Sequence, residues 1–159
     1  MSYEYNASAA KAMYEAICIA LDNRDWKYTR HDEKLFVTFS VNGTDLPMDF
    51  LFMVTKTAPF IQLISRMPFT FPEEQLVKGA IAVAEANWGC INGCFDLGLE
   101  DGEVLFKLTQ SFRDSLIGDN CIQYMINIGC HMVDQYSARF LALSKGIMSI
   151  EEFLAKENE

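Results

Sequence analysis

The stretch KLFVTFSVNGTDLPMDFLFMV, residues 34–54, has the two-residue hydrophobic period of β-strands. At its centre, the segment Asn42-Gly43-Thr44-Asp45 carries a turn signal. The apolar residues that alternate with their neighbours are Leu35, Val37, Phe39 and Val41 before the turn, and Leu46, Met48, Phe50, Phe52 and Val54 after it. The stretch therefore predicts two antiparallel strands that share one apolar face.

The opposite face of the same two strands is also partly apolar, because Phe36, Leu51 and Met53 lie on it. A sheet with one face in solvent alternates more cleanly than this. Two explanations stay open at this point. Either the N-terminal helix or a loop covers the second face, or that face is an interface with another subunit or a target peptide.

Beyond residue 54, Pro59 interrupts the alternating pattern, and residues 60–66 predict another strand. A short strand at residues 26–30 is a further candidate before the first one. Phe69 and Phe71 then lie between two prolines, where they are either core or contact surface. The candidate partner-binding residues are therefore Phe36, Leu51, Met53, Phe69 and Phe71.

Two long segments with a helical period flank the strands. Residues 7–22 predict a helix that Asn6 or Ser8 caps, and residues 118–145 predict a longer one that Asp119 or Asn120 caps. Lys145-Gly146 ends the long helix, and Ser149 with Glu152 forms a capping box for a short last helix.

A further helix is expected after Pro72, which suits a first helical position. Glu73 and Glu74 favour the positive end of its dipole, and Gly89 is a plausible stop. Its apolar stripe consists of Leu76, Val77, Ala80, Ile81, Ala84 and Trp88.

Residues 94–112 predict a hairpin around Asp101-Gly102, a type I′ turn signal. Pairing Glu100 with Glu103 sets three apolar pairs on one face: Leu99 with Val104, Leu97 with Phe106, and Phe95 with Leu108. On this register Asp96 lies on the opposite face near Lys107, which predicts a solvated cross-strand charge pair.

The predicted order is α-β-β-β-α-β-β-α with a terminal helical turn. Strands joined by hairpins and interrupted by helices indicate an α+β fold with an antiparallel sheet, not a doubly wound one. A length of 159 residues suits a single domain covering residues 1–159. Half of the residues are hydrophobic, so the core needs neither metals nor disulfides.

The formal net charge of −9 and the pI of about 4.7 argue against nucleic acid and anionic membranes as partners. A basic or mostly apolar partner is compatible with them. We find no signal peptide and no apolar run of membrane-spanning length. The five cysteines are an odd number, and we expect them to be small buried hydrophobes in a reducing cytoplasm.

No motif in the chain predicts catalysis, a metal or a cofactor. Cys130 and His131 are adjacent on a helix and point about 100° apart, so they do not form a nucleophile–base pair. Cys90 and Cys94 lack the spacing of a zinc or thioredoxin-like motif and are expected to flank a turn, pairing only under oxidation. The glycines at 89 and 93 lie between a helix and a strand, which is the wrong order for a phosphate loop. No two carboxylates are placed at catalytic spacing, so the chain is not expected to be an enzyme.

Three stretches resemble the YbjN-like family, described as bacterial sensory transduction regulators. The stretch MPFTFPEE, residues 67–74, is similar to the entry of the family's second helix. GCFDLGLEDGEV, residues 93–104, is similar to its central hairpin. Tyr136, Ser137 and Phe140, followed by Gly146 and by SIEEF at residues 149–153, resemble its C-terminal end.

The resemblance covers most of residues 26–153 and implies the fold of type III secretion chaperones, which are small acidic cytoplasmic homodimers that hold extended segments of partner proteins. It implies no catalytic residues. We therefore expect a YbjN-like, non-catalytic protein-binding or regulatory module of the bacterial cytoplasm that is chaperone-like and homodimeric. The alternative is a small-molecule sensor with a ligand between sheet and helices, lined by Phe and Met residues.

Overall fold

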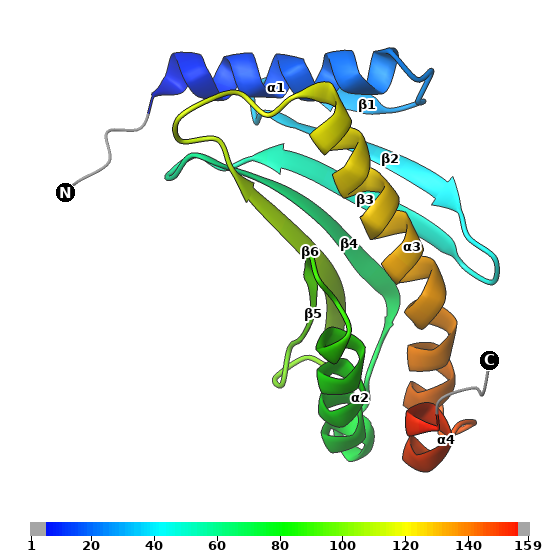
Figure 1. Ribbon diagram of the computed structural model, residues 1–159. Helices are drawn as coiled ribbons and strands as arrows, with labels where there is room; N and C mark the ends of the chain where they lie inside the picture. Colours follow the sequence, from blue (N-terminus) through cyan, green and yellow to red (C-terminus); the bar gives the residue numbers. More distant parts are fainter. Residues whose placement is uncertain (1–5, 156–159) are drawn as a thin grey trace.

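The computed structural model describes residues 6–155 and shows an antiparallel sheet flanked by helices (Figure 1). The elements are α1 (Ala7–Asp22), β1 (Thr29–His31), β2 (Phe36–Asn42), β3 (Pro47–Val54), β4 (Phe60–Thr70), the 3-10 turn η1 (Glu73–Gln75), α2 (Leu76–Trp88), β5 (Cys94–Leu97), β6 (Glu103–Ser111), α3 (Asp119–Ser144) and α4 (Ile150–Leu154). Within residues 6–155 the strands form one sheet in the order β1-β2-β3-β4-β6-β5. The predicted α+β class with an antiparallel sheet is confirmed.

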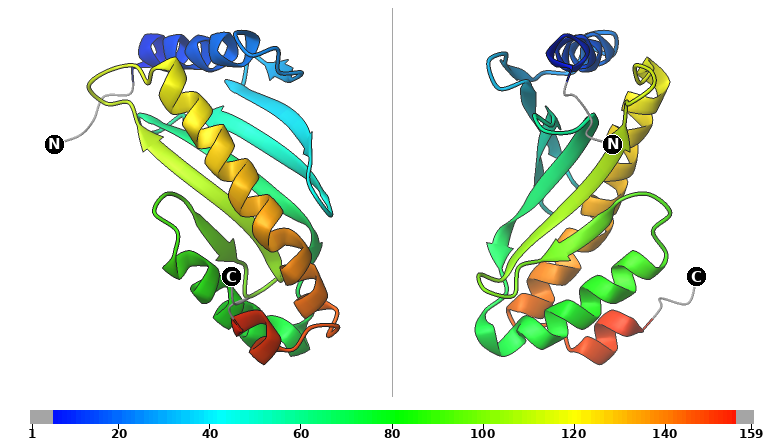
Figure 2. Two further views of the ribbon diagram at one scale, coloured as in Figure 1. Left: turned by 45° about the vertical axis from the view of Figure 1, so that its right-hand side comes forward. Right: turned by 90° about the vertical axis from the view of Figure 1, so that its left-hand side faces the viewer.

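One face of the sheet is the floor of the core, and α3 crosses it (Figure 2). Gly129 brings α3 close to the strands, because a Cβ atom there would lie 2.7 Å from Leu63 Cδ2 and 3.2 Å from Phe50 Cε1. Helix α1 packs beside the first turns of α3, where the Gln123 side chain donates a 2.7 Å hydrogen bond to the Ala20 carbonyl. Six of the nine period-two residues predicted for this face are buried, namely Val37, Phe39, Met48, Phe50, Phe52 and Val54, whereas Leu35, Val41 and Leu46 are half-buried.

Local capping signals predicted most helix ends. The Asn6 side chain accepts a hydrogen bond from the Ala9 N–H at 3.0 Å, and Ser149 forms the predicted capping box with Glu152. The start of α3 differs, because Gly118 is its N-cap and Asp119 instead binds Arg24 at 2.6 Å. That ion pair keeps the pKa of the Asp119 carboxyl low, through its hydrogen bond from Arg24.

The structure also extends the third predicted strand. Residues 60–66 were expected, whereas β4 continues to Thr70 with a register irregularity between Arg66 and Thr70. Pro68 lies in this irregular part, where a missing N–H is tolerated. The short strand expected at 26–30 is β1, which begins at Thr29.

The predicted register of the hairpin at 94–112 is wrong by two residues. Leu97 pairs with Val104 and Phe95 with Phe106, because the connecting loop is longer than a two-residue turn. The Gly98 N–H donates to the Glu103 carbonyl, and only Gly102 in this loop has a positive φ, of 72°. A type I′ turn needs two such residues.

Contact with the preceding strand explains the longer loop. The Phe71 N–H donates a 2.8 Å hydrogen bond to the Gly102 carbonyl, and Thr70 pairs with Glu103. A tertiary contact thus decides the loop over the local turn signal. Because the register differs from the predicted one by an even number of residues, each side chain stays on the predicted face of the hairpin. Lys107 Nζ lies 2.5 Å from Asp96 Oδ2, which confirms the predicted charge pair.

Of the apolar stripe predicted for the second helix, Leu76 packs against the core and the other members do not. The residues of α2 that pack inward are Gly79, Ala82, Val83 and Ala86. Val77, Ile81 and Trp88 are instead 74%, 43% and 88% exposed. Four small or β-branched residues allow α2 to pack closely against its neighbours, which leaves the larger apolar residues outside.

Asn87 ties α2 to the sheet edge. Its side chain accepts a 2.7 Å hydrogen bond from the Phe95 N–H and donates a 2.9 Å bond to the Phe95 carbonyl. The amide group therefore takes the place of a neighbouring strand along β5.

We expect Asn87→Ala to lower the free energy of unfolding by about 1–3 kcal/mol, because two partly buried backbone groups lose their partner. Urea unfolding measures the change. Asn127→Ala, the same substitution at an exposed position of α3, is the control and is expected to change it by less than about 0.5 kcal/mol. Equal effects of the two substitutions would contradict this role of Asn87.

Candidate functional site

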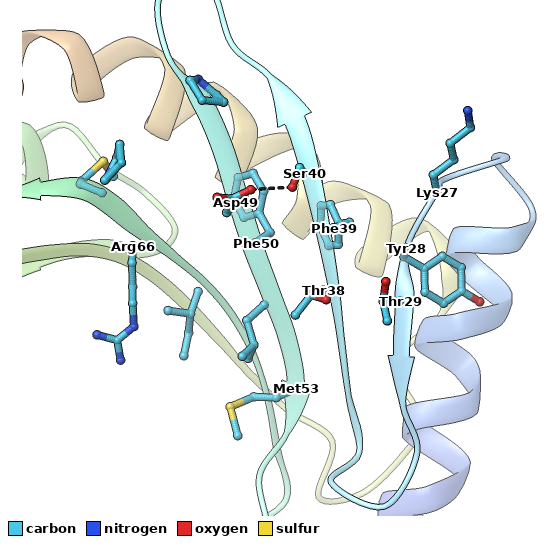
Figure 3. A pocket seen from close by; sticks show the side chains of 15 residues that line it. Lys27, Tyr28, Thr29, Thr38, Phe39, Ser40, Asp49, Phe50, Met53 and Arg66 are labelled. Atoms are coloured by element: carbon cyan, nitrogen blue, oxygen red, sulfur yellow. Dashed lines mark hydrogen bonds between the residues drawn. The ribbon is translucent and has the colours of Figure 1, made fainter.

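A groove of about 980 Å³ lies on the face of the sheet opposite α3 (Figure 3). Strands β2, β3 and β4 form its floor, and residues 27–29 form one side. Its lining residues are Lys27, Tyr28, Thr29, Thr38, Phe39, Ser40, Pro47, Asp49, Phe50, Leu51, Met53, Ile64, Arg66, Met67 and Pro68. The groove is thus built mainly from the second face of the strands.

Cross-strand pairing brings the apolar part of the floor together. Leu51 pairs with Thr38 of β2 on one side and with Ile64 of β4 on the other, and Met53 lies two residues further along β3. All four side chains are half-buried, although they point away from the core. The helices α1 and α3 contribute no residue to the lining of this groove.

Polar and charged side chains surround the apolar floor. Ser40 donates a 2.5 Å hydrogen bond to the carboxylate of Asp49 at one end. Lys27 and Arg66 lie on opposite sides of the groove (Figure 3), and Arg66 also forms an ion pair with Glu103 of β6. Positive groups therefore flank this surface in a protein whose formal net charge is −9.

The five candidate residues from the sequence do not form one site. Leu51 and Met53 line the groove, and Phe36 is the strand partner of Met53. The Phe36 ring is stacked on His31 with 4.2 Å between centroids. Within residues 6–155, α1 contributes no residue to the lining of the groove, so the expected covering of this face by the N-terminal helix is not found there; residues 27–29 border the groove on one side.

Phe69 and Phe71 lie elsewhere. Phe71 is only 2% exposed and packs against Phe140 with 6.4 Å between ring centroids, so its assignment as a contact residue is wrong and it belongs to the core. Phe69 is half-buried beside it, 6.5 Å from Phe71. The prolines that flank them place both at the end of β4, away from the groove floor.

The sequence analysis did not identify two parts of the surface that the structure shows. Ile64 completes the groove floor and could have been found from the alternation of residues 60–66. The second is the exposed part of α2, formed by Val77, Ala80, Ile81, Ala84 and Trp88, which we call the α2 ridge. Its helical spacing was visible, but apolar spacing alone does not say which side of a helix faces the core.

The two edges of the sheet differ. Strand β1 pairs only with Phe36, Val37 and Thr38 of β2, so in the part of the chain that the structure describes no strand pairs with the outer edge of residues 39–42. The opposite edge, β5, is occupied by the Asn87 side chain. The open edge lies beside the groove, since Ser40 belongs to both.

Cys94 and Cys130, two of the cysteines considered in the sequence, have a raised thiol pKa. Burial, followed by the nearby Asp134 carboxylate, raises the pKa of Cys130 to about 11, while the adjacent His131 is exposed. Burial and Asp96 also raise the pKa of Cys94. Cys90 and Cys94 are both half-buried free thiols, less buried than the core cysteines expected.

Residues 6–155 contain no group of three or more His, Cys, Asp or Glu side chains arranged to hold a metal ion. In the same range no helix combines the length and the apolar character needed to cross a membrane.

The comparisons with known proteins agree with the fold described above. The family model YbjN, described as "Putative bacterial sensory transduction regulator", matches residues 14–142. The crystal structure of YbjN, "a putative transcription regulator from E. coli", has a TM-score of 0.57 at 8% identity, covering 79% of this chain and 92% of that one. The structure of the HopA1-SchA chaperone-effector complex has a TM-score of 0.56 at 9% identity, covering 86% and 99%. No curated protein matches the chain.

Proposed function

The chain belongs to the YbjN family, and from this premise we propose that it is a non-catalytic protein-binding module of the bacterial cytoplasm, which holds a segment of a partner protein in the groove on the open face of its sheet. Residues 1–159 act as one unit in this proposal, and the working form is a homodimer. The observation that carries it is the half-buried apolar floor of Leu51, Met53 and Ile64, in a groove to whose lining no helix of residues 6–155 contributes.

The shape of the groove favours a polypeptide. A volume of about 980 Å³ along three strands is at the upper end of small-molecule pockets and is open to solvent on the sheet surface. The open edge of β2 beside it presents backbone groups with which an extended segment can pair. On the groove face, side chains of a segment paired there would lie beside Ser40, and the segment would continue across the sheet to reach Leu51 and Met53.

The fold supports the same proposal by analogy. One of the similar structures is a chaperone–effector complex. Fold does not fix function, so the groove residues carry the argument. Lys27 and Arg66 at the sides of the groove favour a segment whose apolar residues are flanked by acidic ones.

We expect Leu51→Arg to weaken capture of the partner by roughly 30-fold or more, because a charged side chain at the centre of a contact removes a hot-spot interaction. Proteins retained by the immobilised chain from its own cells are measured by quantitative mass spectrometry. Leu116→Arg, the same substitution at a 53% exposed leucine outside the groove, is the control.

A protein retained by wild type and by Leu116→Arg, but lost with Leu51→Arg, supports the groove as the site. Equal retention by all three would contradict it. A bound metabolite in native mass spectrometry that Leu51→Arg displaces, without any retained protein, would favour the small-molecule sensor instead.

A further inference from the structure

Residues 39–50 form a two-stranded arm at one end of the sheet, which we call the β2–β3 arm (Figure 1). Strand β1 pairs with β2 only over residues 36–38, and β4 pairs with β3 only over residues 51–54. Within the chain that the structure describes, the two strands of the arm therefore pair only with each other. A two-stranded hairpin is barely stable by itself, so the arm needs other contacts to keep its direction.

The arm forms part of the wall of the groove. Within residues 6–155, Leu51 is the last residue of β3 before the arm that pairs with β4, and the two strands then diverge (Figure 3). Asp49 and Phe50 line the groove on the arm side, whereas Arg66 and Met67 line it on the β4 side. Phe50 and Met67 are only 2% and 6% exposed, so between these strands the groove reaches down to the core. The direction of the arm therefore sets the width of this part of the groove.

Asp134 of α3 holds the tip of the arm. The Thr44 N–H donates a 2.6 Å hydrogen bond to Asp134 Oδ1, and the Thr44 hydroxyl donates a 2.8 Å bond to Asp134 Oδ2. Gly43 permits this close approach, because a Cβ atom there would lie 2.7 Å from Asp134 Oδ1. Both oxygens of the carboxylate thus bind one residue of the turn, and hydrogen bonds to a charged acceptor are stronger than neutral ones.

Helix α3 also contacts the base of the arm. A Cβ atom at Gly129 would lie 3.2 Å from Phe50 of the arm and 2.7 Å from Leu63 of β4, so the helix is close to both strands where they diverge. Two points of contact, Phe50 at the base and Thr44 at the tip, define the direction of the arm relative to α3. The contact at the tip depends on the carboxylate of Asp134.

We propose that Asp134 is a positioning residue of the groove, whose carboxylate holds Thr44 and thereby fixes the direction of the β2–β3 arm and the width of the groove between β3 and β4. This inference rests on the partner-binding groove of the proposed function and assigns part of its geometry to a side chain that does not line it. Without the carboxylate the arm takes several directions, and the groove has its native width for only a fraction of the time. The apparent affinity for a partner segment falls in proportion to that fraction.

Pulsed electron paramagnetic resonance of the full chain measures the direction of the arm. Spin labels on unnatural amino acids replace two exposed residues, Asn42 on the arm and Thr70 at the end of β4, so the native cysteines stay in place. We expect Asp134→Ala to widen the distribution of label distances about twofold, because the tip of a two-stranded arm without this contact is free to move. Gln135→Ala, at the exposed next residue of α3, is the control and is expected to keep the wild-type distribution.

Further variants separate this contact from a general loss of stability. Thr44→Ser retains both hydrogen bonds and is expected to behave as wild type, whereas Thr44→Val loses the hydroxyl bond and is expected to widen the distribution less than Asp134→Ala does. Asn87→Ala lowers the stability at the opposite edge of the sheet and is expected to leave the distribution unchanged. An unchanged distribution in Asp134→Ala, or an equally wide one in Asn87→Ala, would overturn the positioning role.

Capture of the partner completes the test. Asp134→Ala is expected to weaken retention of the protein that Leu51→Arg loses by about threefold or more, and Thr44→Ser is expected to retain it fully. A widened distance distribution with unchanged capture would contradict the positioning role and leave the groove in place. Equal retention by wild type and Leu51→Arg would instead count against the groove, and the distance measurement would still decide whether Asp134 fixes the arm.

Discussion

Phe140→Ala is expected to lower the free energy of unfolding by about 3–5 kcal/mol, the largest effect of any substitution considered for this fold. Phe140 is fully buried on α3 and contacts three other buried rings. Its centroid lies 5.1 Å from that of Phe95, 5.5 Å from Phe153 and 6.4 Å from Phe71. These rings come from β5, from α4 and from the segment after β4.

The effect is large because Phe140 joins elements that have few other contacts with one another. Its removal leaves a cavity between α3, α4 and the end of the sheet, in addition to the lost transfer energy. Chemical denaturation measures it. Tyr124→Ala on the same helix is the control, since Tyr124 is 44% exposed, and we expect a change of less than about 1 kcal/mol. Comparable values for the two variants would contradict the central role of Phe140.

Gly102→Ala is expected to destabilise the chain by about 3 kcal/mol. Its φ of 72° is unfavourable for a residue with a Cβ atom, and that atom would overlap the Phe71 carbonyl oxygen. Relief of the overlap would break the hydrogen bond from the Phe71 N–H to the Gly102 carbonyl. The loop that fixes the hairpin register would then lose its anchor.

Gly89→Ala is the matched control, because its φ is −91° and nothing lies within 4 Å of a Cβ atom there. It is expected to be neutral or slightly stabilising. Thermal unfolding of both variants measures the difference. A Gly102→Ala variant as stable as Gly89→Ala would show that the loop tolerates a side chain and would contradict this account of the register.

Gly102 also illustrates what the sequence could predict and what it could not. Turn chemistry indicated a hairpin at 94–112 and the correct faces for Phe95 and Phe106. The register depended on Phe71, which is some thirty residues earlier in the chain, so no local pattern could include it. Local signals served better where the structure is local, as at Asn6 and at the Ser149 capping box.

The groove and α2 show the same difference between features that depend on local sequence and features that depend on the whole chain. Alternation placed Leu51 and Met53 on the second face of the strands, and they lie there. Whether a helix covers that face is decided by the path of the whole chain, which periodicity does not contain. For α2, the spacing of apolar residues predicted the wrong side of the helix as the buried one. Val77 and Trp88 have the spacing of a core stripe but are exposed. The residues that pack inward are Gly79, Ala82 and Val83.

The groove is the surface with the clearer consequence for function. It combines an apolar floor with an open strand edge beside it, which suits an extended partner segment.

Site-specific photo-cross-linking tests the central claim most directly. A photoreactive amino acid at Met53, on the groove floor, is compared with the same amino acid at Leu116, which is exposed outside the groove. We expect the Met53 probe to form a covalent adduct with one partner protein in its own cells, the adduct to map to one short segment, and Leu51→Arg to abolish it. Equal labelling from both positions, or no adduct from Met53, would contradict the proposal that the open face of the sheet holds the partner.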